Sequence, residues 1–277
     1  MPDTLRRSRN GGGREATAAV WAAVAGTTVG EAWLRRDEAK PPEVVAKFRE
    51  AVERLERGVP FAYAVGRVGF RTLDLAIDPR ALIPRPETER LVELVLEYGK
   101  RETRNGKRGL AADIGTGCGC IALALAVEGY FDKVIAVEQS PAAAALAREN
   151  VARVAPQTPV EIREGNLLGP LVPKGERYRV IVSNPPYLSA ADHAELDRSV
   201  ADFEPREALV SGADGLEATR RLFAGAAALL EPEGLLALEI DERRADAVRC
   251  LGREYGWLVE IHADLFGCPR YALAKED

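Results

Sequence analysis

The spacing of apolar and polar positions changes twice along the 277-residue chain. From Glu15 to about Arg57, apolar residues recur at three- and four-residue steps, which predicts a small bundle of two to four helices. Residues 2–14 are rich in glycine and arginine and have no such period, so we expect a flexible tail up to residue 14. Residues 61–78 partly alternate between apolar and polar, which predicts a β-hairpin.

From residue 109 onward, short apolar runs alternate with helical patterns. The runs predict strands at 110–114, 133–138, 159–163, 178–183, 234–240, 257–263 and 270–274. Helices are expected at 119–128, 141–154, 192–200, 215–230 and 242–255. Strands joined by helices form a mostly parallel sheet, and the last two strands are too close for a crossover helix. We therefore expect an α/β fold with a seven-stranded Rossmann-like sheet whose last pair is antiparallel.

These patterns divide the chain into three parts. An N-terminal helical domain is expected over residues 1–60, with 1–14 as its tail, and a β-hairpin linker over 61–80. The remaining residues, 81–277, form the α/β domain that carries the chemistry discussed below.

The composition of the chain argues against several classes of function. Asp and Glu outnumber Lys and Arg by 43 to 38, and a formal charge of −5 argues against a strongly basic nucleic-acid binder. Two histidines leave little room for histidine-based metal sites, so no metal is expected. Four cysteines without CxxC spacing suit reduced thiols in the cytoplasm. No apolar run is long enough for a membrane span. The segment Ala16–Gly26 resembles a short secretory signal, but we interpret it as a helix.

The first chemical motif, DIGTGCG, runs from Asp113 to Gly119, directly after a predicted buried strand. Glycine at 115 and 117 lets the backbone turn sharply and approach a ligand. Glu138 ends the next strand, where an acid can bind both hydroxyls of a ribose. A nicotinamide enzyme stays open on this evidence, but Cys120 stands where the dinucleotide fingerprint has its third glycine.

The second motif is SNPPY, from Ser183 to Tyr187, at the end of another predicted strand. The side-chain carbonyl of Asn184 and the backbone carbonyl of Pro185 are two acceptors, which match the two hydrogens of an –NH2 group on a planar carbon. Tyr187 supplies a flat face beside them. The alternative is a Pro-Pro turn capped by asparagine, but its position after a sheet strand favours a site.

Together, the two motifs resemble those of class I S-adenosylmethionine-dependent methyltransferases that act on planar –NH2 nitrogens. The HemK/PrmC family is indicated by PRPETE at 84–89, DIGTGCGCIAL at 113–123, NPPY at 184–187, EPxxALxxGxDGL at 204–216 and DLxGxxR at 264–270. The resemblance runs from about residue 60 to 275. It implies a methyltransferase that modifies the glutamine side chain in the Gly-Gly-Gln motif of peptide chain release factors.

The resemblance also implies roles for individual residues. The cofactor S-adenosyl-L-methionine is expected to lie against Asp113, Gly115, Thr116, Gly117, Glu138 (at its ribose), Asn166 and Leu167 (at its adenine) and Asn184. The target amide is expected to be bound by Asn184, Pro185, Pro186 and Tyr187, of which Asn184, Pro185 and Tyr187 are the expected catalytic residues. The loop 84–89 would cover the cofactor, and the N-terminal domain would recognise the release factor. We expect a monomer that binds neither nucleic acid stably nor membranes.

Two positions depart from the family pattern, and two other functions stay open. Asn166 stands where an aspartate is usual, and Asp241 where a glycine is usual.

The alternative functions are methylation of a ribosomal-protein glutamine and methylation of an adenine amino group in nucleic acid. A third alternative, a non-catalytic cofactor-binding module, would not need Asn184 and Pro185. The PRPETE loop favours release factors, and the charge of −5 argues against a base-flipping enzyme.

Overall fold

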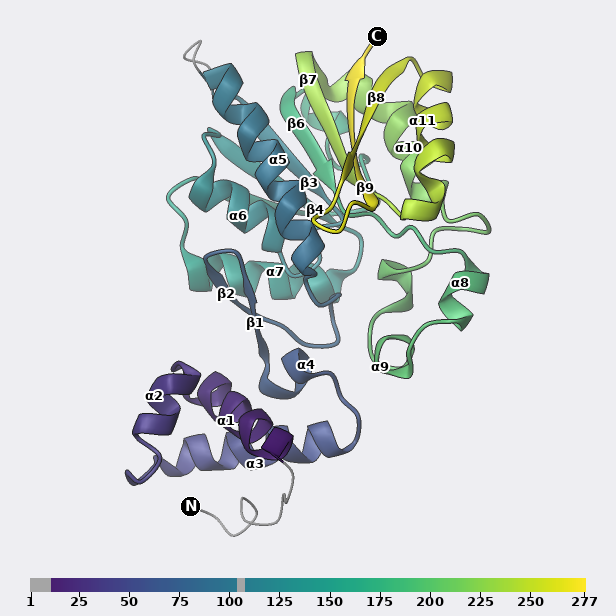
Figure 1. The fold of residues 1–277 in the computed structure, drawn as a ribbon. Coiled ribbons are helices and arrows are strands. Elements are labelled where there is room, and N and C mark those ends of the chain that lie inside the picture. Colours follow the sequence, from purple (N-terminus) through teal and green to yellow (C-terminus); the bar gives the residue numbers. More distant parts are fainter. Residues whose placement is uncertain (1–10, 104–107) are drawn as a thin grey trace. The chain divides into compact units, whose positions relative to one another are not determined.

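The computed structural model describes residues 11–103 and 108–277 (Figure 1). The chain divides after Arg67 into two compact units. Residues 1–10 of the expected tail lie outside the described residues, and residues 11–14 belong to the first helix, so this helix begins before the predicted end of the tail. The three-part division with boundaries after residues 60 and 80 stays a prediction.

The first unit is helical in its described part, as expected. Its helices are α1 (Gly11–Ala25), α2 (Val29–Leu34), α3 (Pro42–Glu56) and α4 (Phe61–Val65). Thr28 caps α2: its hydroxyl accepts a hydrogen bond from the Glu31 amide, and the Glu31 carboxylate accepts one from the Thr28 amide. The small core is formed by Val20, Phe48 and Ala51, with Trp21 packed against Phe48 at a ring distance of 5.1 Å.

The hairpin prediction was wrong for its first five residues. Phe61–Val65 form α4, which is bounded by Pro60 and by Gly66 in a left-handed conformation with φ of 75°. Proline suits a helix start and glycine a left-handed helix end, and these two signals outweigh the short alternation between them. The strands themselves are β1 (Arg67–Phe70) and β2 (Leu73–Ala76), which pair with each other.

The second unit contains a seven-stranded sheet in the order β5-β4-β3-β6-β7-β9-β8 (Figure 1). The strands are β3 (Leu110–Ile114), β4 (Lys133–Glu138), β5 (Val160–Glu164), β6 (Tyr178–Ser183), β7 (Leu230–Glu239), β8 (Trp257–Ala263) and β9 (Pro269–Glu276). The first five in this order are parallel, and β9 is antiparallel to both of its neighbours. The expected fold class is therefore confirmed, including the antiparallel last pair.

Helices cover both faces of this sheet, with α5, α6 and α7 on one face and α10 and α11 on the other (Figure 1). Their bounds are α5 (Pro86–Thr103), α6 (Cys120–Glu128), α7 (Pro141–Val154), α10 (Glu217–Ala226) and α11 (Ala245–Glu254). Short 3-10 turns occur at Val172–Lys174, Arg206–Ala208, Ala227–Leu229 and Glu242–Arg244. None of the helices within the described ranges is long and apolar enough to cross a membrane.

One predicted helix, 192–200, is two helices in the structure. These are α8 (Ala190–Ala194) and α9 (Arg198–Ala201). Ser189 starts the first with a capping box, and the carboxylate of Asp197 accepts a hydrogen bond from the Ser199 amide and starts the second. A cap in the middle of the segment ends one helix and begins the next, which apolar spacing alone does not reveal. The helices predicted at 215–230 and 242–255 are shorter than expected. 3-10 turns occupy 227–229 and 242–244, residues 215–216 precede α10, and Leu230 already belongs to β7.

The sheet order determines where the two chemical motifs lie. The DIGTGCG loop follows β3 and the SNPPY segment ends β6, and these two parallel strands are neighbours. Glu138 ends β4, on the other side of β3. The carboxyl ends of parallel strands form one edge of a sheet, so all three features meet at the same edge.

Candidate functional site

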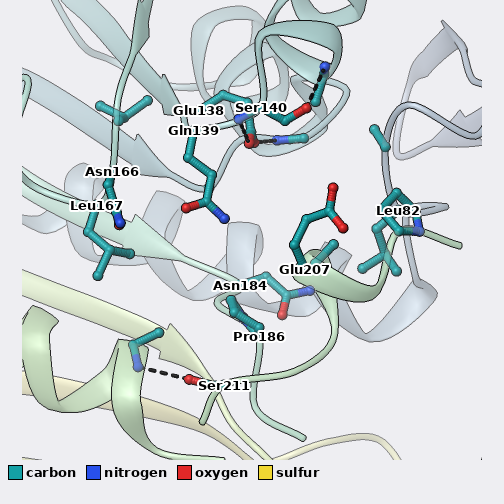
Figure 2. A pocket seen from close by; sticks show the side chains of 18 of the residues that line it. Leu82, Glu138, Gln139, Ser140, Asn166, Leu167, Asn184, Pro186, Glu207 and Ser211 are labelled. Atoms are coloured by element: carbon teal, nitrogen blue, oxygen red, sulfur yellow. Dashed lines mark hydrogen bonds between the residues drawn. The ribbon is translucent and has the colours of Figure 1, made fainter. Parts of the chain in front are cut away.

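A cavity of about 310 Å³ lies at this edge (Figure 2). The predicted site residues among those that line it are Gly115, Gly117, Glu138, Asn166, Leu167, Asn184 and Pro186. They come from the loops after β3, β4, β5 and β6. Asp113, Thr116, Pro185 and Tyr187 do not line the cavity and lie behind these residues or beside them.

The glycines of the first motif shape one wall. Gly115, Gly117 and Gly119 all have left-handed backbones, with φ of 74°, 56° and 89°. The amides of Gly115 and Thr116 donate to the carbonyl of Val137, which ties the loop to β4. Apart from its two chain neighbours, no described residue comes within 4 Å of the place where a Cβ on Gly115 would stand, so backbone conformation rather than crowding requires glycine there.

Asp113 supports this loop from inside the protein. Its Oδ2 accepts hydrogen bonds from the Thr116 hydroxyl at 2.5 Å and from the Ala122 amide at 3.0 Å. The side chain is fully buried, which raises its pKa to about 7. Asp113 therefore joins the loop to the first turn of α6, and its carboxylate faces Thr116 and Ala122 rather than the cavity.

Glu138 presents its carboxylate to the cavity. Its Oε2 accepts from the Gly117 amide at 2.8 Å, and its Oε1 accepts from the Ser140 amide at 2.9 Å. Each carboxylate oxygen has a second lone pair, so both still accept a hydrogen bond from a ligand. Two such acceptors side by side suit the paired hydroxyls of a ribose.

The loop after β5 forms the wall next to Glu138. Leu167 packs against the main core and lines the cavity, and its φ of 48° is unusual for a branched side chain. Asn166 is exposed beside it (Figure 2). Gln139, which sequence reasoning missed, extends its amide into the cavity (Figure 2). Its only sequence signal is its place directly after Glu138.

Asn184 lies at the other side of the cavity, and its amide nitrogen is already occupied. Nδ2 donates to the hydroxyl of Thr88 at 3.0 Å. The Thr88 hydroxyl in turn donates to Oε2 of Glu239 at 2.7 Å. Because the nitrogen faces Thr88, the Oδ1 atom of Asn184 is the one left to accept a hydrogen bond from a ligand.

Tyr187 and Glu239 pack behind Asn184. The Tyr187 hydroxyl donates to Oε1 of Glu239 at 3.4 Å, and burial raises the pKa of this tyrosine well above its usual value. Glu239 is 1% exposed at the end of β7, and burial raises its pKa to about 7. Sequence reasoning assigned no role to Glu239 or Thr88. The signals were the place of Thr88 in the PRPETE motif at 84–89 and the position of Glu239 at the carboxyl end of a predicted strand.

The expected loop 84–89 is only partly a loop, because Pro86–Glu89 form the first turn of α5, and none of these residues lines the cavity. A salt bridge joins Arg85 in this segment to Glu204. Arg85 Nη2 lies 2.6 Å from Oε1 of Glu204, and Oε2 of Glu204 accepts from the Ile83 amide at 3.2 Å. The Glu204 side chain is 1% exposed. Leu82 and Pro205, which neighbour these groups in the chain, both line the cavity. The salt bridge with Glu204 gives Arg85 a role, which the family resemblance left open.

We expect Arg85→Ala to lower the free energy of unfolding by about 1–3 kcal/mol, because a buried carboxylate then loses its charged partner. Chemical denaturation measures this difference. Arg90→Ala is the control: Arg90 pairs with Glu93 and Glu97 on the exposed side of α5, and its loss should stay within about 0.5 kcal/mol. Equal losses of unfolding free energy in the two variants would contradict a stabilising role of the Arg85–Glu204 salt bridge.

An acidic side chain also lines the cavity near Asn184. Glu207 projects into it between Asn184 and Leu82 (Figure 2). Of the arginines that line it, Arg80 is paired with both Asp78 and Glu149. Sequence reasoning missed Glu207, because its motif was recognised by the flanking Glu204-Pro205 and Ala208-Leu209 pairs.

Two family profiles match the sequence. The profile described as "PrmC N-terminal domain" matches residues 3–66, and the one described as "Methyltransferase small domain" matches residues 94–202.

Curated relatives match over most of their length. A protein of Deinococcus radiodurans is 40% identical over 87% of this chain and 84% of its own. A protein of Xylella fastidiosa is 45% identical over 74% and 71%, and one of Koribacter versatilis is 38% identical over 83% and 80%. All three are named release factor glutamine methyltransferase.

Solved structures share the fold at low identity. The catalytic domain of hMettl16, in complex with an RNA hairpin, has a TM-score of 0.56 at 16% identity and covers 86% of this chain and 82% of that one. A methyltransferase from Pyrococcus furiosus has a TM-score of 0.50 at 22% identity, with coverage of 80% and 95%. These similarities support the fold alone.

Proposed function

Because the chain belongs to the family of release factor glutamine methyltransferases, we propose that it methylates the side-chain amide nitrogen (N5) of the glutamine in the Gly-Gly-Gln motif of peptide chain release factors. The observation that carries the proposal is the anchored Asn184, whose Oδ1 is left as an acceptor at the cavity. An acceptor at this place suits an N–H donor such as a glutamine amide.

The cofactor of this family of enzymes is S-adenosyl-L-methionine, and the cavity fits it. Its volume of about 310 Å³, the left-handed glycines and the two free lone pairs of Glu138 are the features that a nucleoside with an amino-acid tail requires. Gly115 and Gly117 would hold its methionine part, Glu138 its ribose, and Asn166 and Leu167 its adenine. When bound, it supplies a methyl group on a positively charged sulfur.

The chain's own residues act on the acceptor amide. An amide nitrogen is a weak nucleophile because its lone pair is delocalised into the carbonyl group. Asn184 Oδ1 and the carbonyl of Pro185, which stands beside the cavity between the lining residues Asn184 and Pro186, would accept its two N–H hydrogens. They would hold the nitrogen in one place and favour localisation of the lone pair. Orientation of this kind supplies about 7–11 kcal/mol in favourable cases. A strong base is not needed beforehand, because the methylated nitrogen is acidic and loses its proton afterwards.

The decisive experiment uses S-adenosylmethionine with a labelled methyl group. The protein is incubated with an unmodified release factor and, in parallel, with the same factor whose motif glutamine is replaced by alanine. We expect label in the first factor alone. If cofactor binds but neither factor is labelled, the proposal fails, and a ribosomal-protein glutamine and an adenine amino group are tested next.

Four further expectations belong to the same proposal. We propose that the helical first unit recognises the release factor, which the match of residues 3–66 to the PrmC N-terminal domain supports. We also propose that the enzyme acts in the cytoplasm, since its substrates take part in translation. A monomeric state and the lack of stable nucleic-acid binding stay predictions, which size-exclusion chromatography and an RNA-binding titration measure.

A further inference from the structure

We propose that Thr88 and Glu239 are positioning residues that determine which atom of Asn184 faces the target amide. The three residues lie far apart in the sequence: Thr88 is in the first turn of α5, Asn184 follows β6 and Glu239 ends β7. In the structure they form one chain of hydrogen bonds, Asn184 Nδ2 to Thr88 Oγ1 at 3.0 Å and Thr88 Oγ1 to Glu239 Oε2 at 2.7 Å. The inference rests on the proposed function, because it concerns the geometry of amide binding.

The direction of this chain follows from its chemistry. An ionised carboxylate only accepts hydrogen bonds, so the single hydrogen of the Thr88 hydroxyl points to Glu239. The Thr88 oxygen is then an acceptor for Asn184, and only the –NH2 end of that side chain can donate to it. Thr88 is 2% exposed and Glu239 is 1% exposed, so water does not offer a ready substitute for either partner.

The orientation matters because the target is itself an –NH2 group. With Nδ2 turned towards Thr88, Asn184 presents Oδ1 as an acceptor to the target N–H. With the side chain flipped, two –NH2 groups would face each other, and the target would lose a hydrogen bond and gain a repulsive contact. Asparagine alone has no strong preference between the two orientations, and the buried Glu239 carboxylate supplies one.

Protonation of Glu239 would remove this preference. A neutral carboxyl group can donate as well as accept, so the Thr88 hydrogen would be free to turn towards Asn184. Burial raises the pKa of Glu239 to about 7, and the group is ionised above that value. The charged and titratable groups that face it are Thr88's neighbour Glu87 on α5, Tyr187 after β6, and Arg270 and Tyr271 on β9. Arg270 favours ionisation and Glu87 opposes it.

The kinetic test compares Thr88→Val with Thr88→Ser. Valine removes the hydroxyl at nearly constant size, whereas serine keeps it. We expect valine to lower kcat about tenfold, the effect of one oriented hydrogen bond, with an unchanged Kd for S-adenosylmethionine. Serine should restore kcat to within about threefold of the starting protein. Thr219→Val is the matched control, because Thr219 is also a buried threonine, 1% exposed, but lies on α10 outside the cavity lining.

The pH profile of kcat tests Glu239, with S-adenosylmethionine saturating at every pH so that Asp113, which supports the cofactor loop and also has a pKa of about 7, does not limit the rate. In the starting protein kcat should fall as the pH decreases through about 7, and Glu239→Gln should lack this acid limb, since glutamine does not titrate there. A glutamine amide can serve Thr88 as donor or acceptor, so we also expect a lower kcat at pH 8. An unchanged kcat in Thr88→Val, or an acid limb retained in Glu239→Gln, would overturn the inference.

A substrate-free measurement separates this inference from the proposed function. The side-chain –NH2 signal of Asn184, identified by its disappearance in Asn184→Ala, is followed by ¹⁵N NMR. We expect slow hydrogen exchange in the starting protein and at least tenfold faster exchange in Thr88→Val. If release factors are not methylated but this difference is found, the proposed function fails and the positioning network stands. If exchange is equal in both proteins, the network fails whatever the substrate.

Discussion

Asn184→Ala is expected to lower kcat for release factor methylation about 10²–10³-fold, the range observed when one preorganised polar contact to a reacting group is removed. The alanine variant loses the Oδ1 acceptor at the cavity, while the cavity-lining residues Gly115, Gly117 and Glu138, which we propose hold the cofactor, keep their contacts. The Kd of S-adenosylmethionine should therefore change less than about threefold. Steady-state kinetics with labelled cofactor measures kcat, and calorimetry measures Kd.

Asn166→Ala is the matched comparison for Asn184→Ala. It removes the same side chain from another loop that lines the same cavity, after β5 instead of β6. We expect its effect mainly on the Kd of the cofactor and little on kcat. A kcat of Asn184→Ala within threefold of the starting protein would show that another group holds the target amide.

Glu138→Ala is expected to weaken S-adenosylmethionine binding about 10²-fold or more. The carboxylate has two tasks in the structure: it holds the amides of Gly117 and Ser140, and its remaining lone pairs face the cavity. Hydrogen bonds to a charged group contribute about 1.5–3 kcal/mol each, and each 1.4 kcal/mol is a factor of ten in Kd. Glu138→Gln keeps one acceptor oxygen and should lie between alanine and the starting protein. Calorimetric titration measures all three.

Glu164→Ala supplies the control for Glu138→Ala. Glu164 ends β5, the strand next to β4, and forms an exposed ion pair with Arg148 at 2.8 Å. It does not line the cavity, so its removal should change the Kd by less than about twofold. Similar losses in the two variants would mean that negative charge near the sheet edge, rather than the contacts of Glu138, attracts the cofactor.

Much of the fold was predictable because the local pattern and the tertiary structure agree. The strands at 110–114, 133–138 and 178–183 and the helix at 141–154 have their predicted bounds. The strands are marked by short apolar runs, which are rich in β-branched residues at 133–138 and 178–183, and the helix is marked by the cap Ser140 and the first-turn proline. Where caps and glycines interrupt a segment, as in 61–65 and 192–200, periodicity alone was misleading.

The chemical motifs were predictable for a topological reason. Gly115, Glu138 and Asn184 each follow a strand of a parallel sheet, and the carboxyl ends of such strands form one edge. The sequence by itself therefore determined the fold class and the kind of cofactor, and it predicted which residues form the target-amide site. These properties depend on residue types at strand ends, which local sequence carries directly.

Only the tertiary structure decided which groups hold the side chains of the site in place. Thr88 contacts Asn184 across 96 positions and Glu239 across 151, and Arg85 reaches Glu204 across 119. No periodic pattern relates residues so far apart, because their contact depends on the order of strands and on how α5 packs against the sheet. The orientation of the Asn184 amide is such a property: it follows from one buried carboxylate at the end of another strand.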